Sequence, residues 1–258
     1  MKSYRIITIS NRQPTAWYFL QEQFYKSLGD YKVDTLVPQY WGGLMTKPRT
    51  LFQYIEQGNV TEEYIIFPDN WDVVFAATPD EIMTRFHSFY SDVVISAEAN
   101  CFPDDLRNDY DKLDNQGMPY KYLNSGFIVG KTSAIFECLK AMDLPSIPDD
   151  YYDNEKGCNV HPNDQFEWQK IFLKQPVSIA LDRHQILCQT LHDAKPEQFD
   201  FSSERIKNVI TDSYPCSFHY NGASKDFMPI RVPILKKLNL LDPNEENRDL
   251  YESYMGNQ

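Results

Sequence analysis

The stretch Tyr64-Ile65-Ile66-Phe67-Pro68-Asp69-Asn70-Trp71-Asp72 joins a run of large apolar residues to a turn that carries two carboxylates. A short apolar run bounded by turn residues predicts a buried strand. The carboxylates of Asp69 and Asp72 would then follow the C-terminal end of that strand, where the sheets of α/β proteins bind their ligands. Asp is also favoured in turns because it hydrogen-bonds to nearby backbone. By itself, the motif fits either a ligand site or a solvated turn.

A second segment has the same organisation: the apolar run Cys216-Ser217-Phe218 is followed by His219-Tyr220-Asn221-Gly222-Ala223-Ser224-Lys225. Together the two segments offer carboxylate oxygens, one imidazole and one amine. Asp oxygens, an imidazole and diphosphate oxygens suit six-coordinate Mn²⁺ or Mg²⁺. Such a metal, helped by Lys225, offsets the charge on a departing nucleoside diphosphate. The pair of segments therefore predicts the metal and diphosphate site of a nucleotide-sugar transferase.

The composition limits the class of protein. The chain has 258 residues, of which 42% are hydrophobic and 14% aromatic, enough for the core of one large domain. Its formal charge of −12 argues against a surface that grips nucleic-acid phosphates. A nucleotide bound through a metal is still compatible with this charge, because the cation reverses the local sign.

Cysteine usage and hydropathy indicate the compartment. The five cysteines are widely spaced and form no CxxC pair, so neither a zinc cage nor a disulfide framework is expected. The apolar run Ile6–Ile9 is too short for the core of a signal peptide, and no run is long enough to span a bilayer. We therefore expect a soluble, intracellular protein with no membrane span.

Strands and helices are expected to alternate through the first half of the chain. Strands are predicted at residues 5–10, 32–37, 64–67 and 93–96, and helices at residues 15–28, at residues 46–57 and from Thr78 onward. In the first helix, Trp17, Leu20, Phe24 and Leu28 form a stripe for core packing. This alternation predicts a doubly wound α/β sheet.

The second half is less regular. A long loop is expected over residues 145–162, which are rich in Pro, Asp, Asn and Tyr, and long loops of this kind are often functional. A helix at 164–173 and a strand at 177–181 follow, and the chain beyond Asp242 is polar. Asp182 is expected to be structural.

Three further polar segments have two interpretations each. Residues 96–104 (Ser-Ala-Glu-Ala-Asn-Cys-Phe-Pro-Asp) and 123–130 (Leu-Asn-Ser-Gly-Phe-Ile-Val-Gly) fit either site loops or simple turns beside buried strands. In Asn163-Asp164-Gln165, Asp164 fits either an active-site carboxylate or the N-cap of the following helix.

Taken in order, these segments resemble the glycosyltransferase domain of the procollagen lysyl hydroxylase family. The resemblance runs from about Tyr4 to about Lys225 and is most specific in the D-x-x-D of Asp69 and Asp72, in Tyr122-Leu123-Asn124-Ser125-Gly126 and in the H-x-x-G-x-x-K spacing from His219. It implies a single α/β domain of the GT-A type, with a Rossmann-like mixed sheet flanked by helices, over residues 1–241, followed by a polar tail at 242–258. It also implies a UDP-sugar donor and Mn²⁺, or Mg²⁺ in its place.

The resemblance assigns roles to individual residues. Asp69, Asp72 and His219 match the metal ligands, and Asp164 and Gln165 match catalytic positions on the sugar side of the donor. Trp71 matches an aromatic residue that stacks on uracil. The remaining donor-binding positions implied are Thr8, Lys47, Glu98, Asn124, Asn221, Gly222 and Lys225.

This sequence also departs from the family pattern. His161-Pro162-Asn163 precede Asp164 where the family has consecutive Asp residues, Phe102 replaces a Trp, and Tyr220 replaces a Gly. No hydroxylase domain dependent on iron and 2-oxoglutarate follows, which predicts a stand-alone transferase. The resemblance implies retaining transfer of glucose, or of galactose, to hydroxylysine or galactosyl-hydroxylysine of a collagen-like chain. Two alternatives are a transferase for another glycan or protein acceptor and a UDP-sugar-binding module without transfer activity.

Overall fold

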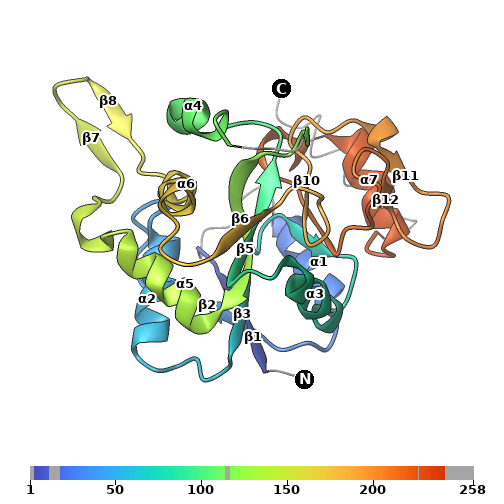
Figure 1. The fold of residues 1–258 in the computed structure, drawn as a ribbon, viewed down its shortest axis with the longest axis horizontal. Helices are drawn as coiled ribbons and strands as arrows, with labels where there is room; N and C mark the ends of the chain where they lie inside the picture. Colours follow the sequence, from blue (N-terminus) through green and yellow to red (C-terminus); the bar gives the residue numbers. More distant parts are fainter. Residues whose placement is uncertain (1–2, 12–17, 114–116, 226, 242–258) are drawn as a thin grey trace.

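The computed structural model describes residues 3–11, 18–113, 117–225 and 227–241. A six-stranded sheet forms its centre (Figure 1), with the order β2-β1-β3-β6-β5-β9. The strands are β1 (Tyr4–Ile9), β2 (Val33–Leu36), β3 (Tyr64–Pro68), β5 (Val93–Glu98), β6 (Tyr122–Lys131) and β9 (Ile179–Asp182). β1 is parallel to both β2 and β3, β5 is parallel to β9, and β6 is antiparallel to both β3 and β5. Every strand except β6 therefore points the same way, and the predicted mixed α/β sheet is confirmed.

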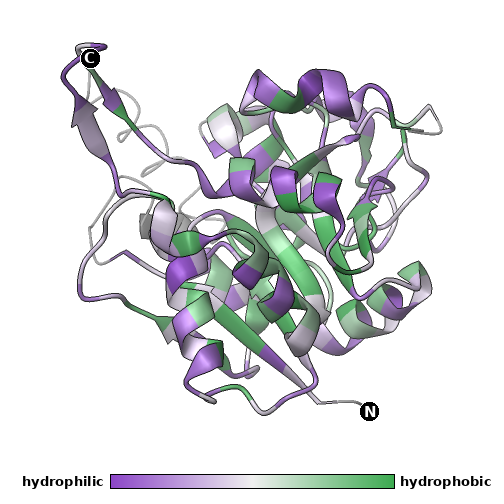
Figure 2. Cartoon of the chain, turned by 60° about the vertical axis from the view of Figure 1, so that its left-hand side comes forward, coloured by the Kyte–Doolittle hydropathy of each residue, from purple (hydrophilic) through white to green (hydrophobic). Residues whose placement is uncertain are grey.

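Alternation of side chains along the strands builds a core on each face of this sheet. On one face Ile7, Ile65 and Ile95 pack with the helices α2 (Thr46–Glu56), α5 (Thr132–Ala141) and α6 (Asp164–Lys174). On the other face Ile66 and Val94 pack with α1 (Tyr18–Leu28) and α3 (Pro79–Phe86). Figure 2 shows the hydrophobic strands at the centre and hydrophilic residues on the outer sides of the helices.

A second sheet with the order β10-β13-β4 lies beside the first. It consists of β10 (Gln189–Thr190), β13 (Ser217–His219) and β4 (Val73–Phe75), and α7 (Met228–Lys237) packs on it through Ile230 and Ile234. β4 is antiparallel to β13, with Val73 opposite His219. Because β3 and β4 are separated only by the acidic turn, that turn connects the two sheets and comes next to His219.

The remaining short elements lie outside both sheets. They are α4 (Arg107–Tyr110), the two-stranded pair β11 (Phe199–Asp200) and β12 (Lys207–Asn208), the hairpin of β7 (Tyr151–Asp153) and β8 (Cys158–Val160), and five 3₁₀ turns at His87–Phe89, Asp104–Leu106, Leu144–Ser146, Pro196–Gln198 and Gly222–Lys225. In the described part of the chain, no helix has the length and hydrophobicity needed to cross a bilayer.

Most predicted elements are present within one to three residues of their expected ends. Thr78 caps α3 by accepting a hydrogen bond from the backbone N–H of Glu81, as its sequence position predicts. Phe24 and Leu28 are buried, as expected for the stripe on α1. Trp17 and the predicted tail at 242–258 lie outside the described residues.

The prediction of a continuous loop at residues 145–162 is wrong, because β7 and β8 pair within it as an antiparallel hairpin. Nearly all residues of this hairpin are exposed. Its strands bury no apolar face, so the alternation of polar and apolar residues that identifies a strand in a sequence is missing here.

Candidate active site

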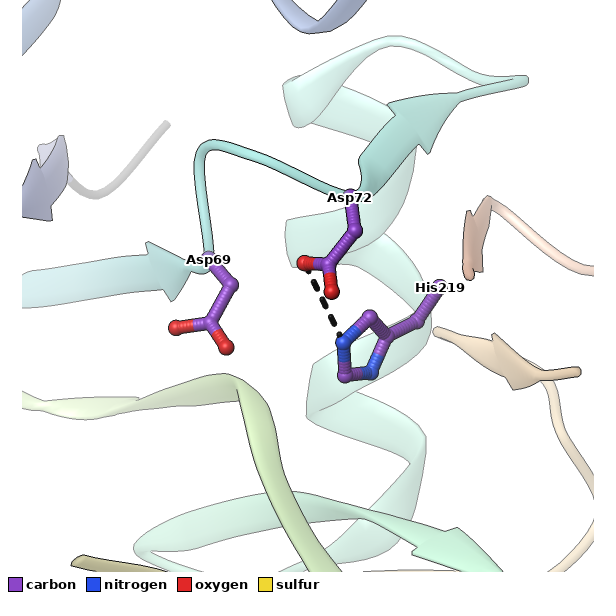
Figure 3. A group of neighbouring side chains, drawn as sticks. All are labelled: Asp69, Asp72 and His219. Atoms are coloured by element: carbon purple, nitrogen blue, oxygen red, sulfur yellow. Dashed lines mark ion pairs between the residues drawn. The ribbon is translucent and has the colours of Figure 1, made fainter. Parts of the chain in front are cut away.

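Asp69, Asp72 and His219 converge where the two sheets meet (Figure 3). Asp69 follows β3, Asp72 precedes β4, and His219 ends β13. One ligand atom from each residue lies within 4.8 Å of the others, and His219 Nε2 is 3.3 Å from Asp72 Oδ1. Asp72 and His219 are buried, whereas Asp69 is partly exposed.

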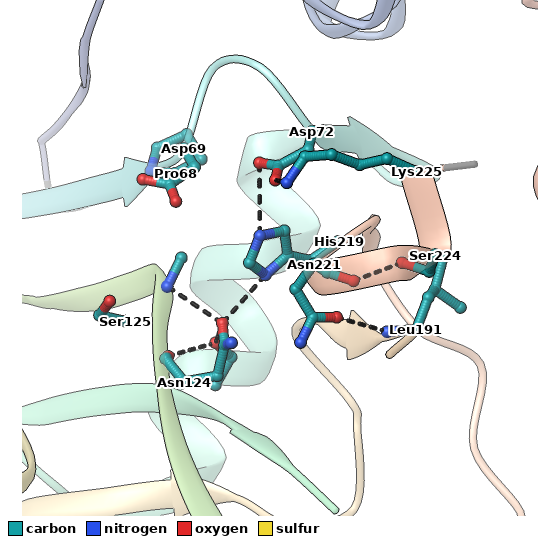
Figure 4. A network of polar contacts seen from close by, with 12 residues as sticks. Pro68, Asp69, Asp72, Asn124, Ser125, Leu191, His219, Asn221, Ser224 and Lys225 are labelled. Atoms are coloured by element: carbon teal, nitrogen blue, oxygen red, sulfur yellow. Dashed lines mark hydrogen bonds and ion pairs between the residues drawn. The ribbon is translucent and has the colours of Figure 1, made fainter. Parts of the chain in front are cut away.

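Hydrogen bonds fix the orientation of the His219 imidazole (Figure 4). Asn124 donates from Nδ2 to Glu98 Oε1 at 3.2 Å, so its Oδ1 is the acceptor that faces the imidazole. That Oδ1 lies 2.9 Å from His219 Nδ1 and also accepts the backbone N–H of Gly126 at 3.1 Å. Nδ1 therefore donates to Asn124, and Nε2 is the ring nitrogen that faces Asp72, as the ligating nitrogen of a metal-binding histidine would.

The buried carboxylate of Asp72 is held in its ionised form. Burial alone would raise its pKa, but His219 and Lys225 outweigh burial and lower the pKa well below its usual range. Lys225 Nζ lies 2.5 Å from Asp72 Oδ2, while Oδ1 accepts no hydrogen bond from any described residue. An anionic oxygen without a donor, a second carboxylate and an imidazole nitrogen form a donor set that fits a divalent cation.

Lys47 connects the Asp69 carboxylate to that of Asp164. Its Nζ lies 2.9 Å from Asp69 Oδ1 and 2.9 Å from Asp164 Oδ2. Burial alone would lower the pKa of Lys47, but the two carboxylates outweigh it and raise the pKa. The pKa of Asp164 is raised by its burial, and Lys47 opposes this effect. A protonated Lys47 thus stabilises two neighbouring carboxylates in one buried cluster.

The N-cap of α6 is Asn163, so the interpretation of Asp164 as the cap is wrong. Asn163 Oδ1 accepts the backbone N–H of Gln165 at 2.8 Å, because Asn163 has the extended backbone that an N-cap requires. The carboxylate of Asp164 instead accepts a hydrogen bond from Ser125 Oγ at 3.2 Å and pairs with Lys47.

Glu98, at the end of β5, accepts hydrogen bonds from three side-chain carboxamides. Its Oε1 accepts from Asn124 and from Gln165 Nε2, the latter at 2.8 Å, and its Oε2 accepts from Asn221 Nδ2 at 2.9 Å. Burial raises the pKa of Glu98, against these donors. The same Asn221 accepts the backbone N–H of His192. Glu98 therefore links β5 to β6, to α6 and to the loop after β13.

The polar run Asn124-Ser125-Gly126 lies inside β6, so the interpretation of this run as a simple turn before the strand is wrong. The pairing of β5 with β6 shifts register between Ile95 and Ala97, and the residues from Asn124 to Phe127 form the corresponding irregularity. Because β6 runs opposite to β3 and β5, its first residues lie at the same edge of the sheet as the C-terminal ends of those strands. Bulges of this kind redirect side chains beside active sites.

Two cavities share the acidic turn. The larger, of about 470 Å³, is lined by eleven of the predicted residues: Lys47, Asp69, Asp72, Glu98, Asn124, Asp164, Gln165, His219, Asn221, Gly222 and Lys225. The smaller, of about 290 Å³, contains Trp71 and Trp41. Both cavities include Leu44, Lys47, Asp69, Asp72 and Lys225, so the cluster of Asp69, Asp72 and His219 lies at their junction.

One of the predicted site residues lies outside both cavities, and the cavities contain residues that the sequence did not predict as site residues. Thr8 lines neither cavity: it is fully buried, and its hydroxyl donates to the Pro68 carbonyl at 2.8 Å, which fixes the end of β3. The larger cavity also contains Asn100, Ser125 and His192, and the smaller contains Trp41. Ser125 lies within a polar run visible in the sequence. No feature of the neighbouring sequence identifies His192 as a site residue, because its position depends on a hydrogen bond to the distant Asn221.

Comparison with known proteins identifies the family. A model of the PLOD GT domain, a glycosyltransferase domain, matches residues 29–230, most of the chain. The chain belongs to the PLOD GT domain family. The resemblance predicted from the motifs is thereby confirmed, and the match includes every predicted site residue except Thr8.

Two relatives indicate how this PLOD GT domain compares with larger proteins. It is 31% identical over 215 residues to a procollagen-lysine,2-oxoglutarate 5-dioxygenase of Drosophila melanogaster, covering 76% of this chain and 28% of the fly protein. It is 29% identical over 188 residues to the human multifunctional procollagen lysine hydroxylase and glycosyltransferase LH3, covering 69% of this chain and 23% of the human protein. The aligned chain spans about a quarter of these relatives.

The PLOD GT domain also aligns with a solved structure, that of a glycosyltransferase involved in the glycosylation of the major capsid of PBCV-1. The TM-score is 0.49 and the sequence identity 14%, covering 92% of this chain and all of the other.

Proposed function

We propose that the chain is a UDP-sugar glycosyltransferase that depends on Mn²⁺, or on Mg²⁺ in its place. Its donor sugar would be glucose or galactose. The observation that carries this proposal is the cluster of Asp69, Asp72 and His219 at the junction of two cavities. A nucleotide sugar consists of a base with its ribose, a diphosphate and a sugar, in that order. One cavity for the base and one for the sugar, with a metal and diphosphate site between them, would match this order.

The base would lie in the smaller cavity. Trp71 is partly buried there, and Trp41 lines the same space. Stacking of a base on an aromatic ring contributes about 1–3 kcal/mol and does not depend on hydrogen bonds to the edge of the base. The diphosphate would then lie beside the acidic turn and Lys225, and the sugar would enter the larger cavity toward Asp164 and Glu98.

The residues around the sugar support transfer. A bound divalent cation, held by Asp69, Asp72 and His219, would offset the negative charge on the leaving UDP. The ammonium of Lys225 adds a second cation near the same phosphates. Asp164 and Gln165 line the larger cavity, where they can orient the sugar hydroxyls or the incoming acceptor hydroxyl. Retention at the anomeric carbon, through attack from the face that UDP leaves, is the mechanism we propose by family resemblance.

The proposed acceptor is the hydroxyl of hydroxylysine or galactosyl-hydroxylysine in a collagen-like polypeptide. The names of the relatives, which refer to procollagen lysine, support it. A binding module without transfer activity would use the same donor contacts, so turnover of the donor distinguishes the two functions.

Turnover of the donor tests the proposal. UDP release would be measured for UDP-glucose, UDP-galactose and UDP-N-acetylglucosamine, with Mn²⁺, Mg²⁺ or a chelator, and with and without hydroxylysine-containing collagen-like peptides. We expect release that requires the metal and rises with the peptide. Asp69→Ala, Asp72→Ala and His219→Ala should each abolish it, while Glu137→Ala, which removes an exposed carboxylate on α5, should leave it unchanged. Tight UDP binding without turnover of any donor would favour the binding module.

A further inference from the structure

The hairpin of β7 and β8 projects from the body of the molecule next to α6 (Figure 1). Figure 2 shows that its residues are largely hydrophilic. Tyr151 and Tyr152 are 43% and 57% exposed, although Tyr is a residue that gains from burial. Among the described residues the two strands pair only with each other, so the outer edge of each strand has backbone groups without a strand partner.

The base of the hairpin is attached firmly to the loop before α2. The backbone N–H of Asp150 donates to the Gly42 carbonyl at 2.8 Å. Arg49 pairs with the Asp149 carboxylate and donates to the Ile147 carbonyl. Gly43 has a positive φ of 103°, and a Cβ there would overlap with the Asp150 carboxylate. These contacts hold the first leg of the hairpin in a fixed position.

The second leg is tied to the first and leads into the active site. His161 Nδ1 lies 2.9 Å from Asp150 Oδ2, which joins the two legs at their base. Three residues after His161 the chain reaches Asp164, which lines the larger cavity. On the other side, Leu44 follows the Gly42–Gly43 contact directly and lines both cavities. The hairpin therefore rises from the rim of the proposed active site.

We infer that this hairpin is an arm that binds the acceptor, and that the acceptor is an extended, positively charged polypeptide. The inference rests on the proposed function and adds to it the surface that binds the acceptor. At about 3.3 Å per residue, the leg from Asp150 to Asn154 extends about 13 Å from the rim. That distance exceeds the size of one sugar ring, so the arm contacts parts of the acceptor away from the reacting hydroxyl.

The chemistry of the arm indicates a polypeptide rather than a glycan. Free strand edges pair with the backbone of an extended peptide, and successive side chains, such as Tyr151 and Tyr152, point to opposite faces. Between Asp149 and Val160 the arm has four carboxylates and a single basic residue, Lys156. Three of the carboxylates, those of Asp149, Asp150 and Asp153, pair with Arg49, His161 and Lys156, so the negative charge open to a partner is that of Glu155 near the tip. Complementary charge speeds encounter and selects partners.

The role of the arm is tested by measuring binding of the acceptor peptide and transfer of the sugar in separate assays. In one variant a Gly-Ser-Gly linker replaces residues 151–160 and keeps Asp150 and His161. In a second, Glu155→Lys reverses an exposed charge near the tip, and Glu137→Lys on α5 is its matched control. The probes are free hydroxylysine and a labelled collagen-like peptide that contains lysine and hydroxylysine, with a version in which glutamine replaces the lysines.

We expect the linker variant to keep its UDP-sugar hydrolysis and its transfer to free hydroxylysine within twofold, while its KM for the peptide rises at least tenfold. Glu155→Lys should weaken peptide binding several-fold at low salt and much less at high salt, and Glu137→Lys should not. The glutamine peptide should bind the parent protein more weakly than the lysine peptide.

Equal peptide affinity in the parent and in both arm variants would overturn the inference. An equal increase in KM for free hydroxylysine and for the peptide would also overturn it, because the arm would then act at the reacting hydroxyl and not on the rest of the polypeptide. Absence of donor turnover in the parent would defeat the proposed function instead, and fluorescence anisotropy with the labelled peptide would still decide the role of the arm. If the linker variant does not fold, Glu155→Lys and its control decide the outcome alone.

Discussion

The imidazole of His219 packs against Gly126 so closely that a Cβ at Gly126 would overlap with the ring. Gly126 also donates its backbone N–H to Asn124 Oδ1, the same atom that accepts from His219 Nδ1. The bulged part of β6 therefore sets both the position of the histidine and the hydrogen bond of its Nδ1. The proposed metal site would therefore depend on a glycine that offers no ligand.

Gly126→Ala should displace the imidazole of His219 and weaken Mn²⁺ binding about tenfold or more, with a small change in the midpoint of thermal unfolding. Isothermal titration calorimetry with Mn²⁺ in the presence of UDP measures the affinity. Gly130→Ala in the same strand is the control, since its Cβ would lie 2.8 Å from the Asp92 carbonyl oxygen. We expect that variant to lose thermal stability and to keep its metal affinity; the reverse pattern would contradict the role given to Gly126.

Trp71 should stack on the uracil of the donor, because its ring lines the smaller cavity beside two of the ligand carboxylates. With stacking of about 1–3 kcal/mol, Trp71→Ala should weaken UDP binding roughly tenfold or more, and Trp71→Tyr should lose little. Binding of UDP should also quench tryptophan fluorescence in the parent. Unchanged UDP affinity in Trp71→Ala would show that the ring only packs against the protein.

Asp164→Asn should separate catalysis from binding. The substitution keeps an acceptor for Ser125 but removes the charge that faces Lys47 and the sugar side of the cavity. We expect kcat to fall about 10²-fold with UDP affinity nearly unchanged, as for an interaction made mainly in the transition state.

The neighbouring Asn163→Ala is the control for Asp164→Asn, because Asn163 is the N-cap of α6. It should lower the free energy of unfolding by about 1 kcal/mol and leave kcat within a few-fold of the parent. Parental turnover in Asp164→Asn would remove Asp164 from the catalytic group.

The charge of Asp72 should make stability fall at acid pH. Its pKa is lowered in the folded protein from an ordinary value of 3.8, so the folded state favours the ionised form. The stabilisation is therefore fully present above about pH 4 and is lost as the pH falls from there through the lower folded-state pKa. Urea unfolding of the parent and of Asp72→Asn, both without divalent cations, measures it between pH 7 and pH 3.

Below about pH 4 the free energy of unfolding of the parent should fall relative to that of Asp72→Asn. From pH 5 to pH 7 the difference in free energy of unfolding between the two proteins should stay constant. A difference that does not change down to pH 3 would mean that His219 and Lys225 do not stabilise the Asp72 carboxylate.

How far the sequence predicts the fold depends on whether each element has a local signal. The apolar runs at β1, β3 and β5 and the Thr78 cap of α3 are local features, because burial and capping act on residues close in the chain. The hairpin of β7 and β8 was missed because its exposed strands bury no face. The reversed direction of β6 has no local signal either, since strand direction follows from the connections between elements.

The sequence by itself determined the kinds of group in the site: two carboxylates around Trp71, and an imidazole followed by a lysine. Residue type and spacing limit the chemistry, because only certain donors suit a divalent cation and a diphosphate. The tertiary structure alone decided which groups meet. In the folded protein Lys47 lies between Asp69 and Asp164, and three carboxamides donate hydrogen bonds to Glu98. The N-cap of α6 is Asn163 and not Asp164. Such contacts join residues from distant parts of the chain, and their geometry is fixed only when both sheets have packed together.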